Sequence, residues 1–239
     1  MQIIIDSIKR RLHRDIVQHP VSHAWVLNLY RAGERYPQTV CDYFPVKDAP
    51  WPELADDLER PRRDEERHTA MYAHAIRAIG QPVVELEGDE IFNNIIRSHT
   101  GESFTIDDED DADERRRKVA HFLTHAHFLE KRVARSLEYH RDACNRAGSG
   151  DAVRVVDAVM RDEGRHVSYT IEAATELFTH AERENAFAHH RRAEAKANLD
   201  FSKQQMRFFL KQMGSLVGVD RRLLYRVCAF LMEEAVAYV

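Results

Sequence analysis

Glycine and proline, the residues that most often interrupt helices, are scarce in this chain. It has 9 glycines and 7 prolines among 239 residues, which favours helices over strands. Long hydrophobic runs are also missing, and the apolar run near the N-terminus, Ile3 to Ile5, has only three residues. A signal-peptide core needs about 7 to 15 apolar residues and a membrane span about 18 or more. We therefore expect neither a signal peptide nor a membrane span.

Cysteine is too rare, and too widely spaced, to form a disulfide framework. The three cysteines are Cys41, Cys144 and Cys228, and no two of them form a CxxC pair. A reducing cytoplasm is therefore the expected setting. The formal net charge is −5, so no basic surplus attracts nucleic acid. The chain does have 44% hydrophobic residues and 14 histidines, which supply a sizeable core and many nitrogen donors.

The apolar pattern and the positions of proline and glycine predict an all-α chain. Four long helices are expected, joined in order by a short, a long and a short connection. The long connection, 81–111, can travel the length of a bundle, so we predict a four-helix bundle with a crossover between helices two and three. Gly80 is expected to end one helix, and Asp151 to cap another. The expected helices cover 3–17, 21–44, 52–79, 112–145, 152–179, 182–213 and 219–238.

The most informative feature is a five-residue motif, DExRH, that occurs twice. Its copies are 64–68 in the second long helix and 162–166 in the fourth. Residues three apart share a helix face, so Glu65 with His68, and Glu163 with His166, can each bind one metal ion. A lone ExxH is expected about once by chance, whereas two full motifs on corresponding helices are not. The alternative is a pair of exposed charge clusters.

The surroundings of the glutamates favour an interior site. Glu163 shares its face with apolar residues at offsets −7, −4, −3 and +4, and an ionised carboxylate on a buried stripe is costly unless a cation binds it. Glu130 in the third long helix also lies among apolar residues, whereas Glu138 lies among charged ones. Glu34 is the candidate in the first. For Glu130 and Glu34 an exposed side chain remains the alternative.

Six side chains then meet at one level of the bundle. The four glutamates lie about ten to sixteen residues from the helix ends where the short connections begin, so their levels agree within about one turn at ~1.5 Å per residue. Oxygen ligands with one imidazole per ion suit iron or manganese better than zinc or copper. We expect two iron ions, with manganese as an alternative in one or both positions. The predicted ligands are Glu34, Glu65, His68, Glu130, Glu163 and His166.

These residues resemble the ferritin-like di-iron carboxylate superfamily, whose oxygen-activating members use Glu…ExxH…Glu…ExxH. The resemblance covers about 21–180, which divides the chain into a short N-terminal helix at 1–20, a di-metal bundle and a helical extension at 181–239. The DExRH form is similar to the bacterial multicomponent monooxygenases, where the Asp supports a ligand His and the Arg holds the Asp. The resemblance implies these orienting roles for Asp64, Arg67, Asp162 and Arg165.

Two further residues near the predicted ligands have more than one interpretation. Tyr72 follows His68 by four residues, and this order is similar to the ribonucleotide reductase small subunit, where a tyrosine at this place forms a radical. The alternative for Tyr72 is a core tyrosine with a hydrogen-bonded hydroxyl. His127 lies one turn before Glu130, and we expect either a core or ligand-orienting histidine or a seventh ligand.

The resemblance implies an oxidoreductase that uses O2 and an electron donor to oxidise a small organic substrate. One alternative is peroxide reduction or iron handling, as in rubrerythrins and ferritins, although the CxxC pair usual in rubrerythrins is absent. Another is a non-enzymatic helical partner protein with a structural metal site. The apolar C-terminal helix at 219–238 is expected to pack on the bundle or to form a homodimer.

Overall fold

The computed structural model describes residues 2–39, 44–86, 90–101 and 104–239, and every regular element in these ranges is helical. This confirms the all-α prediction. The observed bounds agree with the expected helices within two residues, except at the end of the first long helix. That end was predicted near residue 44, and residues 40–43 lie outside the described ranges. The α-helices are α1 Gln2–Ile16, α2 Pro20–Thr39, α3 Pro52–Ala78, α4 Phe92–Thr100, α5 Ala112–Ala147, α6 Gly150–Leu177, α7 His180–Met213 and α8 Val219–Val236, with short 3-10 helices η1 Val46–Asp48 and η3 Gly214–Leu216.

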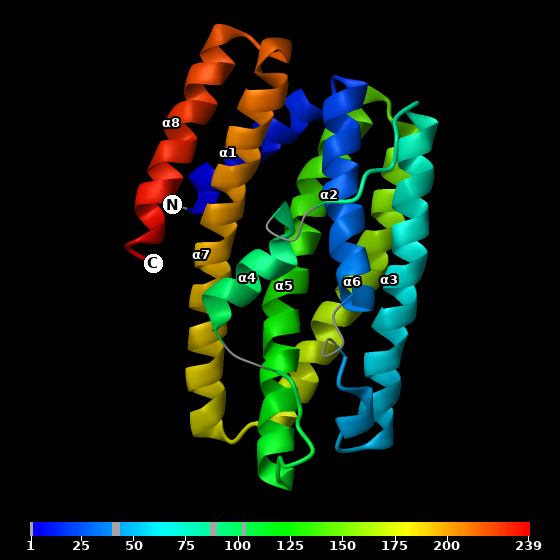
Figure 1. Cartoon of the computed structure of the whole chain (residues 1–239), viewed down its shortest axis with the longest axis vertical. Coiled ribbons are helices and arrows are strands. Elements are labelled where there is room, and N and C mark those ends of the chain that lie inside the picture. The colour runs from blue at the N-terminus through cyan, green and yellow to red at the C-terminus, as the bar shows by residue number, and fades with distance from the viewer. Residues whose placement is uncertain (1, 40–43, 87–89, 102–103) are drawn as a thin grey trace.

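The long helices α2, α3, α5 and α6 lie side by side along the long axis of the molecule (Figure 1). α2 packs on α3, α5 packs on α6, and α3 packs on α6. Short connections join the first two pairs, whereas residues 79–111 connect α3 to α5 and include the short helix α4. α4 packs mainly on α7 and also touches α2, so it lies beside the four long helices rather than among them.

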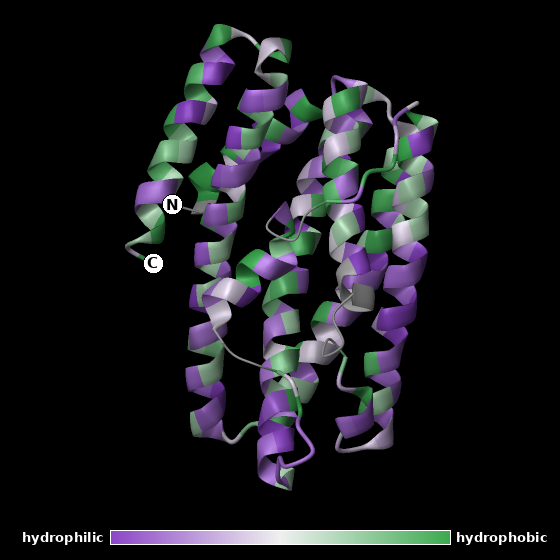
Figure 2. Cartoon of the chain, in the orientation of Figure 1, coloured by the Kyte–Doolittle hydropathy of each residue, from purple (hydrophilic) through white to green (hydrophobic). Residues whose placement is uncertain are grey.

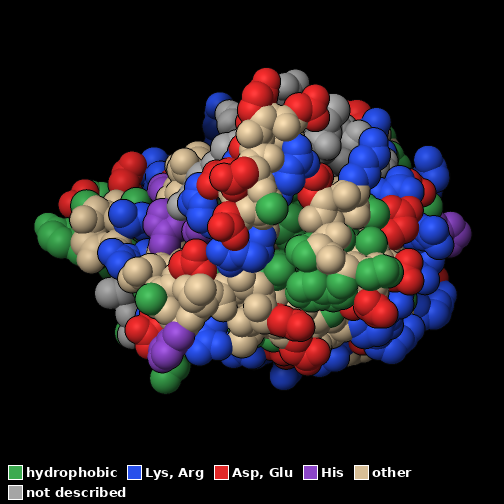
Figure 3. Space-filling view, turned by 90° about the horizontal axis from the view of Figure 1, so that it is seen from below, with side chains coloured by type: hydrophobic (Ala, Val, Ile, Leu, Met, Phe, Trp, Pro, Cys, Tyr) green, Lys and Arg blue, Asp and Glu red, His purple; other side chains and the backbone are tan. Residues whose placement is uncertain are grey.

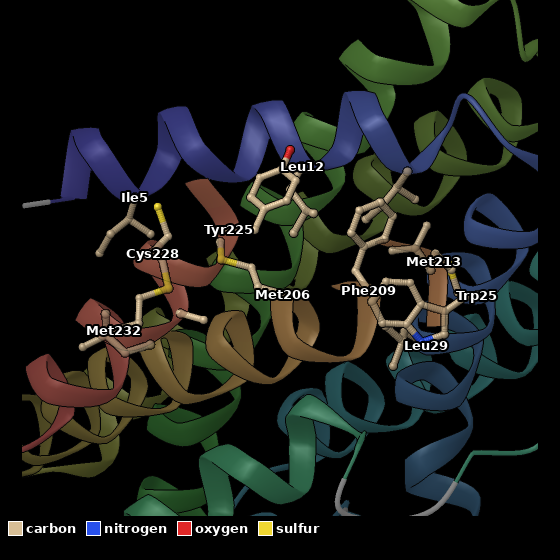
Figure 4. Packing of buried hydrophobic residues seen from close by; sticks show 14 residues of the cluster. Ile5, Leu12, Trp25, Leu29, Met206, Phe209, Met213, Tyr225, Cys228 and Met232 are labelled. Atoms are coloured by element: carbon tan, nitrogen blue, oxygen red, sulfur yellow. The ribbon is translucent and has the colours of Figure 1, made fainter. Parts of the chain in front are cut away.

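A second layer of helices covers one side of α5. α1 and α7 both contact α5, and α8 packs against α7. Their shared core is a cluster of buried side chains from α1, α2, α7 and α8 (Figure 4). Phe209 and Tyr225 meet there edge to face with ring centroids 6.1 Å apart, a favourable arrangement for two aromatic rings. The last sixty residues thus pack onto the rest of the chain, and the proposed division into three segments stays a prediction.

Local sequence signals account for several of the helix ends. Gly80 and Gly148 both adopt a positive φ of 72° just after α3 and α5, the left-handed conformation that glycine adopts without strain. Asp111 caps α5 by accepting a hydrogen bond from the backbone N–H of Glu114. The predicted cap by Asp151 is wrong, because that residue lies inside the first turn of α6 and pairs with Arg154.

The hydropathy pattern matches helices that bury one face. Polar and apolar residues alternate around each helix (Figure 2), as expected for amphipathic helices packed on a common core. Viewed from below, acidic and basic side chains intermingle around an exposed hydrophobic area (Figure 3). Within the described ranges, none of the helices has the length and apolar content that a membrane crossing requires.

Candidate metal centre

The structure places all six predicted ligands in the interior, on four different helices. Glu34 lies on α2, Glu65 and His68 on α3, Glu130 on α5, and Glu163 and His166 on α6. The four glutamates are between 2% and 8% exposed, and the two histidines are 0% and 3% exposed. Because fully buried carboxylates are costly without a compensating charge, this burial needs a physical explanation.

Five of the six side chains form two overlapping groups with the spacing of metal ligands. One group is Glu34, His68 and Glu163, and the other is Glu130, Glu163 and His166. Within each group, one donor atom per residue lies within 4.8 Å of the others. Glu163 belongs to both groups, so its carboxylate is placed between two candidate ion positions. The sixth residue, Glu65, is outside both groups but lines the same pocket as Glu34, Glu130 and Glu163.

Several polar atoms at the centre have no hydrogen-bond partner. They are Glu65 Oε2, Glu163 Oε2 and His166 Nδ1. Buried polar atoms are nearly always satisfied in folded proteins, and these three lie on residues that the motif predicts to bind metal. The donor set therefore fits a pair of cations, which would supply the missing partners.

The carboxylates also repel one another. Burial, followed by the nearby charges of Glu130, Glu34 and Glu163, raises the pKa of Glu65 well above its usual value. Burial and Glu163 do the same to the pKa of Glu130, and burial raises the pKa of Glu163 to about 8. These raised pKa values mean that the carboxylates tend to be protonated when no cation is bound.

Each histidine ring is held so that Nδ1 faces the glutamates. His68 Nε2 lies 3.0 Å from Asp162 Oδ2, while its Nδ1 lies 2.9 Å from Glu34 Oε2. Burial alone would lower the pKa of His68, but its contacts with Glu34 and Asp162 together raise it. A proton on Nδ1 and a metal ion at Nδ1 are alternatives, because both need the same lone pair.

The aspartates of the two motifs orient the histidines of the opposite helix. Asp162 on α6 contacts His68 on α3, and Asp64 on α3 lies 3.4 Å from Nε2 of His166 on α6. Carboxylates in this position fix which nitrogen of a ligand histidine is free to bind metal. The structure thus adds a detail that the sequence did not predict, since each aspartate supports the other motif's ring.

The motif arginines join the two aspartates into one network. Arg67 pairs with both Asp64 and Asp162, and Arg165 does the same from the other helix. Both arginine side chains are about half exposed, so the network lies at the outer edge of the centre. Its four charges balance, which links α3 to α6 without adding to the negative charge of the glutamates.

Tyr72 lies in the core beside the centre, but its hydroxyl has no partner. The side chain is fully buried, and its hydroxyl oxygen makes no hydrogen bond, so the predicted bonded hydroxyl is wrong. Burial and the charge of Glu34 raise the pKa of Tyr72 well above its usual value. Tyr30 is its aromatic neighbour, with ring centroids 5.8 Å apart.

His127 lies outside both ligand groups. Its Nδ1 donates to the backbone carbonyl of Val167 on α6 at 3.1 Å, a bond that holds α5 to α6 one turn from Glu130.

Tyr169, three residues after His166, also lies beside the centre and was not predicted from the sequence. Burial and the charges of Glu130 and Glu65 raise the pKa of Tyr169. The i, i+3 spacing from His166 was the signal that could have identified it.

A pocket opens beside the glutamates between α2 and α5. Its volume is about 60 Å³, and it is partly open to solvent. At Gly33 a Cβ atom would lie 3.3 Å from the Asn93 side chain, so glycine allows α4 to approach α2 closely at this wall. Apolar side chains and two basic residues also line the pocket, among them Leu29, Phe92, Leu129, Val133, Phe201, Lys9 and Arg132.

Comparisons with known proteins give this centre no assignment. No protein-family model, no curated protein and no solved structure was found to match the chain.

Proposed function

We propose that this chain is an oxidoreductase of the ferritin-like di-metal class, which uses O2 to oxidise a small organic substrate. The observation that supports this most strongly is the pair of overlapping ligand groups around Glu163. Together with Glu65, these groups supply four carboxylates and two imidazoles, a donor set suited to iron or manganese. Two divalent cations would neutralise the four carboxylates.

The course of the chain supports the ferritin-like assignment. The connection from α3 to α5 spans 79–111, whereas α2 joins α3, and α5 joins α6, by short loops. A single long crossover between the second and third helices is the connectivity of that fold. The six ligands also come from the same four helices, in the order Glu, ExxH, Glu, ExxH.

The protein's own residues would bind, orient and shield the ions. Glu163 would contact both, Glu34 and Glu130 would each contact one, and Glu65 would complete the set from the pocket side. Asp64 and Asp162 would keep the Nδ1 atoms of His166 and His68 directed inward. When bound, two iron ions supply the electron-transfer chemistry that reduction of O2 requires. The electron donor is a separate partner.

The pocket favours an organic substrate over simple storage of iron. Its walls carry two phenylalanines, Phe92 and Phe201, and several aliphatic residues, a lining suited to an apolar ligand. Glu34, Glu65, Glu130 and Glu163 line this same pocket. A ligand in the pocket would therefore have one part next to the bound ions, which iron handling does not require.

Lys9, which lines the pocket, favours an acidic group on the substrate. Lys9 is 3% exposed and donates to the side-chain oxygen of Asn198, a neutral acceptor, at 2.7 Å. Burial, helped by the nearby charge of Arg132, lowers the pKa of Lys9 to about 7, and the charges of Glu194 and Asp6 partly offset this. An anion bound beside Lys9 would hold it in the ammonium form. The proposed substrate therefore has an apolar body and a carboxylate that binds Lys9.

Oxygen uptake by protein loaded with Fe2+ tests this function. We expect the wild-type protein, reduced anaerobically and then exposed to air, to consume O2 faster than Fe2+ in buffer. Glu163→Gln should remove the uptake, because it changes the residue shared by both ligand groups. Glu66→Gln is the matched control, since Glu66 is the variable residue of the motif at 64–68 and its side chain is exposed. Equal uptake by Glu163→Gln and the wild type would exclude the proposed centre.

A further inference from the structure

A second cluster of potential metal ligands lies near the start of α2 and the end of α5, away from the glutamates. It consists of His23 on α2 and of His140 and Cys144, one turn apart, on α5. The three side chains are 2%, 0% and 0% exposed. One nitrogen of each ring and the Cys144 sulfur lie within 4.8 Å of one another, and His23 Nε2 is 3.6 Å from that sulfur.

One nitrogen of this cluster is left without a partner. His140 Nδ1 lies 3.4 Å from His13 Nδ1, while the buried His140 Nε2 makes no hydrogen bond. A neutral imidazole carries a proton on one nitrogen and a lone pair on the other. If His140 donates to His13, its Nε2 lone pair is unused, and that lone pair is what a metal ion would take. His13 would then act as a positioning residue.

We propose that His23, His140 and Cys144 bind a single Zn2+ ion that ties α2 to α5. Two imidazoles and one thiolate form a softer donor set than the glutamates, and such sets select zinc or copper over iron and manganese. The site is separate from the acidic centre, because His23 precedes Glu34 by eleven residues, or roughly 16 Å along a helix. Two centres of opposite ligand chemistry would thus share one bundle.

The thiol of Cys144 must lose its proton when the ion binds. Burial raises the pKa of this thiol to about 12, so without a cation the sulfur remains protonated. Binding of the ion forms one metal–sulfur bond and releases one proton to solvent. The low pKa of His23, lowered to about 4 by burial, keeps that ring neutral and able to donate its lone pair.

The ion would stiffen the wall of the pocket. α2 and α5 flank the opening beside the glutamates, and α2 packs mainly on α3. A metal bond between α2 and α5 would hold them together at one end while leaving the pocket open at the other. This structural role needs neither O2 nor the acidic centre.

Cobalt and zinc content, measured together, tests the proposal. The protein is expressed in medium enriched in Co2+, so that the ion is present while the chain folds. We expect the wild type to show a sulfur-to-cobalt charge-transfer band, with an intensity that follows the fraction of sites that hold cobalt. The summed cobalt and zinc should fall by one ion per chain in Cys144→Ala. Cys228→Ala is the matched control, because Cys228 is the other buried free cysteine among the described residues.

His23→Gln gives a second test on the opposite helix. It should lose the same single ion and the same band, while circular dichroism shows a folded helical chain. Equal summed metal content in the wild type, Cys144→Ala and His23→Gln would overturn the proposal. A charge-transfer band that persists in Cys144→Ala would also overturn it, because the thiolate would then come from another cysteine. Neither readout depends on oxygen chemistry, so failure here leaves the proposed function standing.

Discussion

The orientation of two histidine rings decides what the acidic centre can hold. Asp162 and Asp64 each contact the outer nitrogen of a ring on the opposite helix, which leaves the inner nitrogens directed at the glutamates. The sequence predicted that the motif aspartates support the histidines. It could not predict the exchange between helices, because that depends on how α3 and α6 are rotated about their axes and not on spacing within either helix.

Replacement of Asp162 by asparagine should weaken metal binding without unfolding the protein. The amide has lost the charge that holds His68 Nε2–H, so we expect about 10- to 100-fold lower affinity, the usual cost of losing such a supporting residue. Competition with a chromophoric chelator measures this change. Asp157→Asn is the control, since Asp157 lies on the same helix and pairs with Arg141 instead. Unchanged affinity in Asp162→Asn would contradict the orienting role.

Replacement of Lys9 by methionine should reduce binding of carboxylate ligands. Losing a charged hydrogen bond costs about 1.5–3 kcal/mol, so we expect decanoate to bind about 10-fold or more weakly, whereas decanol should bind as before. Calorimetric titration of the metal-loaded protein measures both ligands. If the variant loses affinity for decanol as much as for decanoate, Lys9 shapes the pocket but does not recognise an acid.

For the helices, the sequence predicted the features that depend on neighbouring residues in the chain, namely where helices begin and end and which face is buried. Helix periodicity and Gly80 gave bounds close to those observed, whereas the predicted cap at Asp151 was wrong. The burial of Glu130 and Glu163 also followed from apolar neighbours on their own helices. The pocket and the His23–His140–Cys144 cluster were not predicted, because both form between helices that are distant in the sequence.

Gly148 offers a direct test of the helix-end interpretation. An alanine there must adopt the left-handed conformation, so Gly148→Ala should destabilise the fold by about 1–2 kcal/mol. Gly164 lies inside α6, where a Cβ would meet no neighbouring atom, so Gly164→Ala should instead stabilise it by about 0.5–1 kcal/mol. Urea unfolding of the metal-free proteins measures both. If both variants changed the free energy of unfolding in the same direction, Gly148 and Gly164 would not differ in their need for glycine.

At the scale of the whole molecule, buried histidines tie stability to pH. His125 and His190 are 4% and 1% exposed and lie in one cluster between α5 and α7. Burial, helped by the nearby positive charge of Arg97, lowers the pKa of His125 to about 3. Burial, helped by the neighbouring histidines, lowers that of His190 to about 2. In the unfolded chain both histidines should titrate near pH 6.5. Below that pH they are therefore protonated in the unfolded state but remain neutral in the folded state.

Stability should therefore fall as the pH drops from about 6.5 toward 3, by up to ~1.4 kcal/mol per pH unit for each histidine. The double substitution His125→Gln, His190→Gln should make this fall shallower. His180→Gln should not, because His180 is exposed. Urea unfolding at pH 7.5, 6.0 and 5.0 gives the slopes. Parallel slopes in the wild type and the double variant would show that these two histidines do not cause the acid sensitivity.

The outer face of α8 carries exposed apolar side chains that the packing of this chain does not explain. α8 buries one face on α7 but exposes Leu223, Val227, Phe230 and Leu231 on the other. Exposed apolar residues on one helix face favour association. The homodimer expected from the apolar C-terminal segment stays a prediction.

The central claim is that Glu34, Glu65, His68, Glu130, Glu163 and His166 hold two metal ions. Anomalous scattering at the iron and manganese edges, from crystals of protein grown with both metals, tests this most directly. Two anomalous peaks are expected between α2, α3, α5 and α6, each contacted by one histidine, with Glu163 touching both. A single peak, or no peak among these glutamates while the protein remains folded and metal is in excess, would contradict it.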